Sequence, residues 1–200
     1  PGGRGLRKKG KIIGAGQIRA PRNFAMKKTF AFSPDRKTRL YTGVILAFMT
    51  LVGVVAFLPT YNVYLRSEAP FPLINLLPLL LLTIIAAACY LYTPTACEIT
   101  ETLLAIRRGV GRPSFPLSSI TAVRRLEDEE LKNSVRVFGV GGLFGSFGHY
   151  YSSKLGSFSL YARRTTGFVL VEADGRKIVL TPDEPAIFVT ELNNAREALK

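Results

Sequence analysis

Five glycines between residues 139 and 148 are the first feature that suggests ligand chemistry, because backbone amides of a glycine-rich loop can wrap a phosphate. They are Gly139, Gly141, Gly142, Gly145 and Gly148. A dinucleotide fingerprint needs Gly-x-Gly-x-x-Gly between a strand and a helix, but position 144 is Phe and strand-like sequence follows. A phosphate loop needs Gly-Lys-Ser/Thr, which is absent. We interpret residues 139–151 as a glycine-rich turn or wide loop whose apolar side chains pack on the domain or dip into a bilayer.

Residues that could catalyse a reaction or hold a metal are few and scattered. His149 is the only histidine, and it has no neighbouring nucleophile or second ligand in the sequence. Cys89 and Cys97 are eight residues apart, which indicates neither a disulfide framework nor a zinc site. The acidic run 127–130 lacks the Gly and Asn spacing of a calcium loop and is typical of a solvated connector. We therefore predict a protein that is not an enzyme and has no metal or cofactor.

Basic residues offer the clearest binding chemistry. Five arginines come from two adjacent predicted strands and the turn after the first: Arg107, Arg108, Arg112, Arg124 and Arg125. They can converge into a patch for anionic headgroups or phosphate, or they can be solvated charges close to a membrane. Arg163 and Arg164, in a connector, leave the same two alternatives open.

Charge and hydropathy divide the chain into three regions. Residues 1–39 hold 12 of the 27 Lys and Arg residues against one acid, Asp35. Leu40 to Leu58 is then a run of 19 uncharged residues, about 28 Å as a helix at ~1.5 Å per residue, and Leu73 to Tyr92 is a second run of 20. These lengths predict a transmembrane hairpin, 40–58 and 73–92, within a 40–92 membrane region. Pro59 is expected to end the first helix, and an external loop follows it.

The distribution of basic residues predicts the orientation of this hairpin. Twelve precede Leu40 and several follow Tyr92, whereas Arg66 is alone between the runs. By the positive-inside rule both termini are cytoplasmic, in a multi-pass protein of the bacterial inner membrane. A basic segment that leads directly into an apolar run favours membrane lipids over nucleic acid as its partner.

The N-terminal 39 residues are expected to be largely disordered, because they are basic and glycine-rich and lack an apolar period. Met26, which precedes two lysines and the first apolar run, is a candidate for the true start of the protein. Ser33-Pro34-Asp35 is a predicted helix start with Ser33 as N-cap.

Residues 95–200 have the pattern of one compact, mostly β domain. Strands are expected at 95–100, 103–108, 115–126, 135–138, 158–162, 167–173 and 176–180. Asp174-Gly175 predicts a tight hairpin between the last two. Thr181-Pro182-Asp183-Glu184 is a predicted capping box for a C-terminal amphipathic helix with the stripe Ile187, Phe188, Leu192, Ala195 and Leu199.

This region resembles the bacterial pleckstrin-homology-like domains of small membrane proteins. The resemblance rests on EITETLLAIRRGVGR, PLSSITAVRRL, RVFGVGGLFGSFGHYYSSKLGSFSLYARR and KIVLTPDEPAIFV, and the preceding hairpin matches the usual arrangement. It implies a seven-stranded curved sheet or open barrel capped by the C-terminal helix. Phosphoinositide-binding members use basic residues around the first strand–turn–strand, but the matching turn here is Glu101-Thr102, which argues against specific inositol-lipid binding.

The sequence therefore predicts a membrane-anchored binding or scaffolding module that engages a membrane protein partner or forms a homo-oligomer. The exposed edge of its sheet is one candidate surface for a peptide. The alternative is a lipid-headgroup or membrane-sensing module that uses the arginines. A third interpretation is a transporter accessory subunit whose helices pack through Gly43, Gly53, Asn75 and Pro78.

Overall fold

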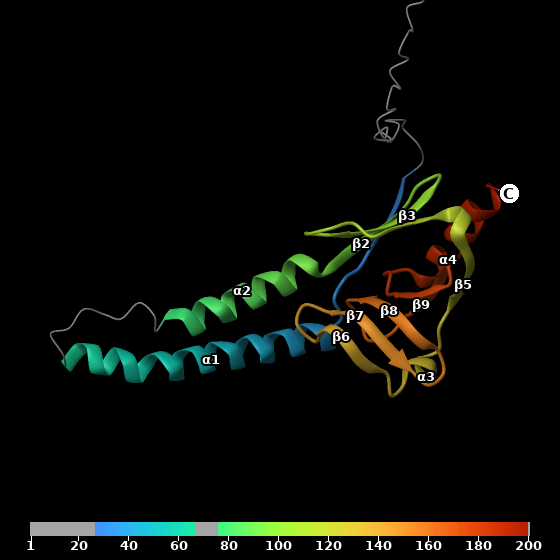
Figure 1. Ribbon diagram of the computed structural model, residues 1–200. Helices are drawn as coiled ribbons and strands as arrows, with labels where there is room; N and C mark the ends of the chain where they lie inside the picture. The colour runs from blue at the N-terminus through green and yellow to red at the C-terminus, as the bar shows by residue number, and fades with distance from the viewer. Residues whose placement is uncertain (1–26, 67–75, 200) are drawn as a thin grey trace, which may run out of the picture.

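Two helices lie side by side and project from a domain built of two β-sheets, as Figure 1 shows for this computed structural model. The structure describes residues 27–66 and 76–199. In chain order the elements are β1 (Lys28–Ala31), α1 (Arg36–Arg66), α2 (Leu77–Tyr92), β2 (Pro94–Ile99), β3 (Leu103–Arg108), β4 (Ser114–Pro116), η2 (Leu117–Ser119), β5 (Ile120–Arg125), α3 (Asp128–Leu131), β6 (Val135–Gly141), β7 (Ser146–Ser152), β8 (Gly156–Ala162), β9 (Val169–Ala173), β10 (Arg176–Leu180) and α4 (Pro185–Glu197).

The strands form one sheet in the order β1-β2-β3-β4 and another in the order β5-β9-β10-β8-β7-β6. All neighbours are antiparallel except β8 and β10. The mostly β domain with a C-terminal helix is confirmed, but two separate sheets stand in place of the expected seven-stranded curved sheet or open barrel. The reason lies at residues 117–119, where the turn η2 breaks the predicted 115–126 strand and passes the chain from the first sheet to the second.

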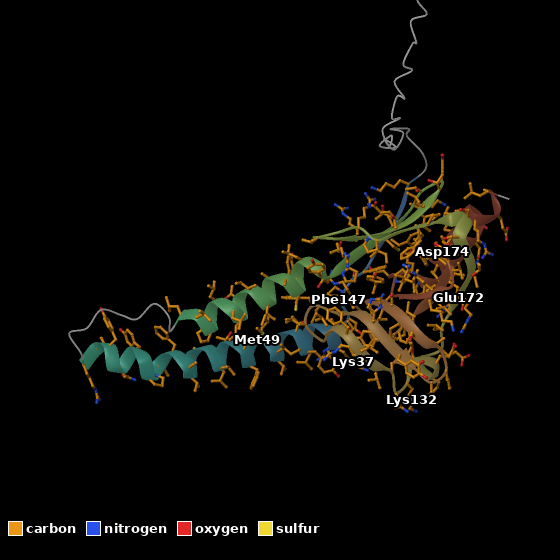
Figure 2. The ribbon with its side chains drawn as sticks, in the orientation of Figure 1. Lys37, Met49, Lys132, Phe147, Glu172 and Asp174 are labelled. Carbon is orange, nitrogen blue, oxygen red and sulfur yellow. The ribbon has the colours of Figure 1, made fainter. Side chains whose placement is uncertain are left out.

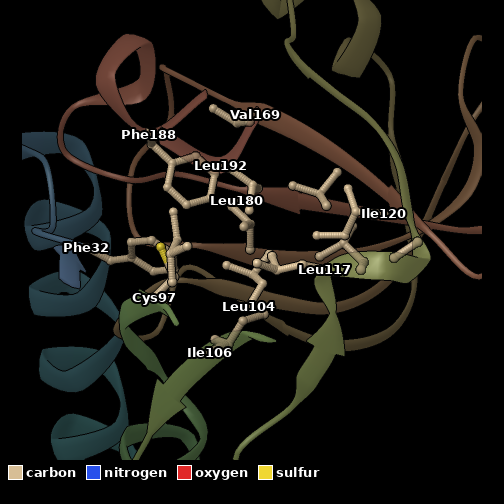
Figure 3. Close-up of a cluster of buried hydrophobic side chains, with 14 residues drawn as sticks. Phe32, Cys97, Leu104, Ile106, Leu117, Ile120, Val169, Leu180, Phe188 and Leu192 are labelled. Carbon is tan, nitrogen blue, oxygen red and sulfur yellow. The ribbon is translucent and has the colours of Figure 1, made fainter. Parts of the chain in front are cut away.

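The main core fills the space between the two sheets and α4 (Figure 3). Cys97, Leu104 and Ile106 from the first sheet meet Val169 and Leu180 from the second. From α4, Phe188 and Leu192 complete this core, which confirms part of the predicted apolar stripe. Ile187 and Leu199 of that stripe are exposed.

A segment before the first helix belongs to this fold, although the sequence placed residues 1–39 in a largely disordered region. β1 pairs with β2 from Lys28↔Ile99 to Ala31↔Ala96. Phe32 is 1% exposed in the main core, and the Phe30 ring packs edge-on against Phe188. Phe30 lies in this four-residue strand and Phe32 directly follows it, and two alternating apolar residues are too short a pattern to stand out in a basic segment. Residues 1–26, with the candidate start Met26, lie outside the described residues.

Residues 32–38 are tied to two loops of the domain, an arrangement we call the N-terminal clamp. Asp183 accepts hydrogen bonds from the Ser33 backbone (2.8 Å) and hydroxyl (2.6 Å). Asp35 accepts from the Thr165 backbone (2.8 Å) and hydroxyl (2.6 Å), and from the Thr38 backbone (2.7 Å). Asp35, not Ser33 as predicted, is therefore the residue that caps α1, because the Ser33 hydroxyl is occupied by Asp183.

The clamp also determines how α4 begins. Thr181 is buried and accepts a hydrogen bond from the Arg163 backbone, and Asp183 faces Ser33. The predicted capping box is absent, and α4 starts at Pro185 with no side-chain cap. A proline does stand at the first helical position, but it is Pro185, three residues after the expected Pro182.

The helical region differs from prediction mainly at its boundaries. α1 runs through Pro59 to Arg66, so the helix is longer than the predicted 40–58 segment and includes part of the expected external loop. It is long and apolar enough to cross a membrane by length and composition, and 6% of its most apolar stretch is buried. α2 has 16 residues, and the predicted start at Leu73 lies outside the described residues, as do loop residues 67–72. At Gly53 an added Cβ would lie 3.2 Å from Leu79 Cδ1, which places a small residue where the two helices meet.

The glycine-rich segment is a pair of strands, β6 and β7, and not the expected turn or wide loop. Gly139 pairs with Gly148, and a Cβ on either would lie 2.2 Å from the carbonyl oxygen of Phe147 or Phe138 respectively. The two strands cross so closely here that only glycine fits at both positions. Glycine interrupts the alternation of apolar and polar residues along β7, and for this reason the sequence did not predict this strand.

The turn between β6 and β7 contacts both long helices. The Thr42 hydroxyl of α1 donates to the Gly142 carbonyl (3.1 Å) and accepts from the Phe144 amide (2.9 Å). The Phe144 ring meets Tyr90 of α2 edge-on, with 5.3 Å between centroids. Figure 2 labels Phe147 at this junction between helices and sheets. Phe144, one of the apolar residues of this segment, thus packs against the two long helices.

The predicted tight hairpin at Asp174-Gly175 is confirmed by the antiparallel pairing of β9 with β10.

Candidate binding surfaces

Strand β6 is an uncovered edge of the second sheet. It is the last strand in the order β5-β9-β10-β8-β7-β6 and runs for seven residues. Its side chains include Val135, Val137 and Phe138, which are 63%, 69% and 76% exposed. An edge strand presents unpaired backbone N–H and C=O groups, and exposed apolar side chains beside them add area for a partner.

The other three sheet edges are shorter or occupied. β5 contacts α4, and Arg196 of α4 donates to the Thr121 carbonyl at 2.8 Å. β4 has three residues, and β1 has four and carries Lys28, which pairs with Glu191 of α4. Within residues 27–66 and 76–199, β6 is therefore the longest edge and the most apolar one.

A groove of about 790 Å³ lies between the end of α2 and one face of β6, β7 and β8. Alternation along the strands brings Phe147, His149, Ser159 and Tyr161 to this face. Ala88, Cys89 and Tyr92 of α2 form the opposite wall, and Arg108 adds positive charge. Arg136 borders the groove through its place in β6, but it pairs with Tyr150 and its guanidinium lies beside Gly141, on the other face of the sheet. We call this the α2–β6 groove. Its lining includes no Asp or Glu side chain.

Arg108 is held inside the groove by weak neutral partners. Its guanidinium carbon lies 5.4 Å from the centroid of the Tyr92 ring, and its Nε donates to the Gly111 carbonyl at 3.3 Å. Burial raises the pKa of Tyr161, and the nearby charge of Arg108 offsets part of this rise. In the part of the chain that the structure describes, neither Arg108 nor Arg136 forms a salt bridge. In the groove, the Arg108 guanidinium therefore has hydrogen-bonding capacity left for an anion.

The other predicted headgroup residues occupy different surroundings. Arg112 pairs with Glu98, a buried carboxylate that also pairs with Lys27 at 2.8 Å. Arg124 makes two hydrogen bonds to Glu130, at 2.8 and 2.7 Å, which lower the pKa of Glu130 to about 2. Arg107 and Arg125 are exposed.

These five arginines divide into two groups in the structure. Arg107, Arg108 and Arg112 are in or after β3, which reaches the end of α2, whereas Arg124 and Arg125 end β5 before α3 (Figure 1). Arg108 also lines the α2–β6 groove, where its guanidinium lies over the Tyr92 ring. No pattern in the sequence connects Arg108 with His149 or Ser159, because the two sheets and α2 meet only in the folded chain.

The remaining candidates from the sequence have structural partners. Arg163 donates to the Phe32 carbonyl at 3.2 Å, and Arg164 donates to the Asp183 carbonyl at 3.2 Å, so both support the N-terminal clamp. Burial lowers the pKa of Arg163. His149 faces Ser159, with 3.3 Å between Nδ1 and Oγ. The acidic run forms the short helix α3 with a capping box between Glu127 and Glu130.

A comparison with protein families matches residues 95–196 of the chain to the family described as bacterial PH domain. The match covers the domain from β2 to the end of α4. PH domains are generally non-catalytic binding modules that commonly bind lipids or proteins. Comparisons with curated proteins and with solved structures gave no match.

Proposed function

This chain belongs to the bacterial PH domain family, and we propose that it is a membrane-anchored, non-catalytic binding module whose β6 edge engages a membrane-associated protein. The observation that carries the proposal is the exposure of Val135, Val137 and Phe138 on a seven-residue strand that pairs, among the described residues, with β7 alone. A partner segment in extended conformation would add to this edge through backbone hydrogen bonds.

The proposed anchor is the pair α1 and α2, in the inner membrane of a bacterium with both chain ends in the cytoplasm. Support comes from the 31 residues of α1, which span about 46 Å at ~1.5 Å per residue, and from the exposure of its apolar side chains. A helix of this composition in a water-soluble protein would normally be buried. Basic residues gather before α1 and after α2, as the positive-inside rule requires for this orientation.

Membrane fractionation tests the anchor directly. The full chain is expected to remain in the membrane pellet after alkaline carbonate extraction. A C-terminal tag is expected to resist protease added to spheroplasts and to be cleaved in inverted vesicles. Release by carbonate, or cleavage in spheroplasts, would contradict the anchor or its orientation.

Site-specific photo-cross-linking tests the edge. A photoreactive side chain at Val137 in the full chain is expected to give an adduct of defined mass, identified by mass spectrometry as a membrane-associated protein. Ile187 on α4 is the matched control, because it is also apolar and 51% exposed but lies on another element. The Val137 adduct should disappear when Val135→Lys is added. An adduct whose mass is twice that of the chain would indicate a homo-oligomer, and equal labelling from both positions would contradict a specific edge.

A second candidate function is contact with anionic lipid headgroups, and the α2–β6 groove favours it. Arg108 lies next to Tyr92, the last residue of α2, and has no carboxylate partner among the described residues. Arg112 and Arg124 already pair with carboxylates, so an arginine-based lipid site would depend mainly on Arg108.

A further inference from the structure

We propose that the β6 edge receives a juxtamembrane segment of a different integral membrane protein, in extended conformation and with acidic side chains that alternate with apolar ones. The inference rests on the proposed function above and deepens it, because it states which kind of segment binds and where that segment lies relative to the membrane. It follows from the direction of β6, from the poor fit of a second copy, and from the side chains on the two faces of the strand.

Strand β6 begins far from the two long helices and ends beside them. Its last residue, Gly141, leads into the turn that α1 holds. There the Thr42 hydroxyl donates to the Gly142 carbonyl and accepts from the Phe144 amide. Its first residue, Val135, follows α3, on the side of the domain away from α1 and α2 (Figure 1). The strand spans about 20 Å at ~3.3 Å per residue, so the edge leads from the proposed anchor into the cytoplasm.

A protein chain that leaves the bilayer beside α1 and α2 meets the Gly141 end of this edge first. Its next residues can continue along β6 without a linker. A segment that follows a transmembrane span would run antiparallel to β6, and one that precedes a span would run parallel to it. Anchoring of both proteins in the same membrane raises the effective concentration of such a segment at the edge.

A second copy of this chain does not fit the same edge within one membrane. A two-fold axis pairs two identical edge strands in an antiparallel manner, so the start of β6 in one copy lies near its end in the other. The helix junction is at the Gly141 end in each copy. The two pairs of helices would then project from opposite ends of the joined strands, and both cannot enter the same bilayer.

Apolar side chains of β6 face the α2–β6 groove. Three of them pair with alternate residues of β7 and therefore lie on one face of the sheet. The pairs are Val135 with Tyr151, Phe138 with His149 and Val140 with Phe147. Every second side chain of an added strand would point to the same face and continue this apolar surface. We therefore expect apolar residues at alternate positions of the partner segment.

Positive charge lies on the opposite face of β6. Arg136 pairs with Tyr150, and an added Cβ on Gly141 would lie 2.8 Å from its Nη1. The exposed guanidinium thus reaches toward the membrane end of the edge, and it forms no salt bridge within residues 27–66 and 76–199. Guanidinium groups pair with carboxylates through two N–H donors, so we expect Asp or Glu at the partner positions that face Arg136.

This charge discriminates against most juxtamembrane segments. Cytoplasmic segments next to a span are usually rich in Lys and Arg, and Arg136 would repel such side chains. Arg108 adds positive charge on the groove side of the sheet. Attraction of an acidic segment and repulsion of a basic one together give specificity. The expected partner is therefore a membrane protein whose juxtamembrane segment is acidic.

Peptide titration tests this chemistry on the full chain in a neutral detergent, because β1 and the clamp make residues 95–200 an incomplete domain. The probe is a fluorescent peptide about as long as β6 in which Val and Glu alternate, and its matched control has Lys in place of Glu. We expect the Glu peptide to bind about tenfold more tightly. N-methylation of one of the two alternating sets of backbone amides should abolish binding, since strand addition needs these donors. Equal affinities of the Glu and Lys peptides would overturn the acidic partner, and binding that resists both N-methylations would overturn strand addition.

Arg136→Gln tests the charged face, and Arg125→Gln is its matched control. Arg125 is also exposed and lies on β5, at the opposite edge of the same sheet. Arg136→Gln is expected to reduce the preference for the Glu peptide to about threefold or less, whereas Arg125→Gln should leave it unchanged. Arg136→Lys, which keeps the charge, should retain most of the preference. An equal reduction in Arg136→Gln and Arg125→Gln would overturn the inference and indicate an effect of net charge alone.

Cross-linking in membranes distinguishes failure of this inference from failure of the proposed function. Small diazirine side chains are placed at Val140 or at Val135 of the full chain, and mass spectrometry identifies the linked partner residues. We expect both to lie in a cytoplasmic segment that adjoins an apolar span, with the residue linked at Val140 nearer to the span.

Three other results would overturn the inference while leaving β6 as a binding edge. They are adducts remote from any span or in the reverse order, adducts between two copies of this chain, and adducts within one chain, which would place its own N-terminal segment on β6. Absence of any protein adduct from both positions would instead contradict the proposed function itself.

Discussion

The N-terminal clamp and the β6 region differ in whether their polar groups have hydrogen-bond partners within the chain. In the clamp, Asp35 and Asp183 receive hydrogen bonds from backbone and hydroxyl donors on both sides. In the β6 region, a strand edge has no neighbour and Arg108 and Arg136 have no carboxylate within the described chain. Carboxylates that accept several hydrogen bonds within the chain stabilise the fold, whereas backbone and guanidinium groups without such partners have capacity for a ligand.

The same contrast appears in the apolar residues. Phe32 of the clamp is 1% exposed, whereas Phe138 of β6 is 76% exposed. Burial of a large side chain stabilises the folded state by itself, and exposure of one costs solubility unless a partner covers it. Phe32 therefore contributes to the stability of the domain, whereas Phe138 is available for contact with a partner.

Truncation of the two phenylalanines should give the largest difference between the regions. Phe32→Ala is expected to lower the free energy of unfolding by about 3–5 kcal/mol, because it opens a cavity between β2 and α4. Phe138→Ala should change it by less than about 0.5 kcal/mol, as an exposed position does. Denaturant unfolding of the full chain in detergent measures both. Similar losses for the two variants would remove the distinction.

Removal of the α1 cap should have the next largest effect. Asp35→Ala leaves the donors of Thr38 and Thr165 without their acceptor, at a cost of about 1–3 kcal/mol in unfolding free energy. Asp128→Ala, at the exposed start of α3, is the control and should cost only a few tenths of a kcal/mol. Thermal unfolding followed by circular dichroism compares them, and an equal loss in both would show that the clamp is not a stabilising element.

Acidification should weaken the clamp and the Arg124–Glu130 pair. Burial alone would raise the pKa of Asp35, but hydrogen bonds from Thr165 and Thr38 outweigh it and hold the pKa well below its usual range. The pKa of Glu130 is likewise lowered, to about 2. Because the folded-state values lie below the unfolded ones, these groups stabilise the protein fully above about pH 5 and progressively less as the pH falls toward them. Unfolding midpoints at pH 7 and pH 3 should therefore differ less in Asp35→Ala than in the parent, and an identical difference would contradict this assignment.

The smallest effect on stability is expected at the strand edge. Val137→Lys should change the unfolding free energy by no more than about 0.5 kcal/mol, since Val137 is 69% exposed. A lysine on an edge strand nevertheless opposes the addition of a further strand. Co-purification of the partner identified by cross-linking, without any photoreactive side chain in the parent or the variant, measures this, with Ile187→Lys as the control. A partner yield unchanged by Val137→Lys would remove β6 as the binding edge.

Local patterns in the sequence predicted the regular parts of the domain well. β2, β3, β8, β9 and β10 follow period-2 alternation and turn signals, and their predicted ranges differ from the structure by at most two residues at each end. The helix α4 was predicted from its apolar stripe, although its capping residues serve the clamp instead. β7 was missed because glycine at the close crossing breaks the alternation, and β1 because four residues are too few for a pattern.

The candidate binding surfaces were only partly within reach of the sequence. The sequence named arginines and an exposed edge as candidates, but it did not indicate which arginines pair with carboxylates or which strand forms the edge. Glu98 and Glu130 neutralise Arg112 and Arg124 through contacts that cross strands or a turn. Such partners depend on the strand register and on where the chain turns.

By itself, then, the sequence determined the two apolar helices, the strand-rich domain, the Asp174-Gly175 hairpin and the final helix, because each depends on residues close together along the chain. The tertiary structure alone decided that Phe32 enters the core, that Asp35 caps α1 against Thr165, and that Arg108 lies over Tyr92 in the α2–β6 groove. The physical reason is that unsatisfied polar groups and exposed apolar area are properties of the folded surface, and they arise only when distant segments have paired.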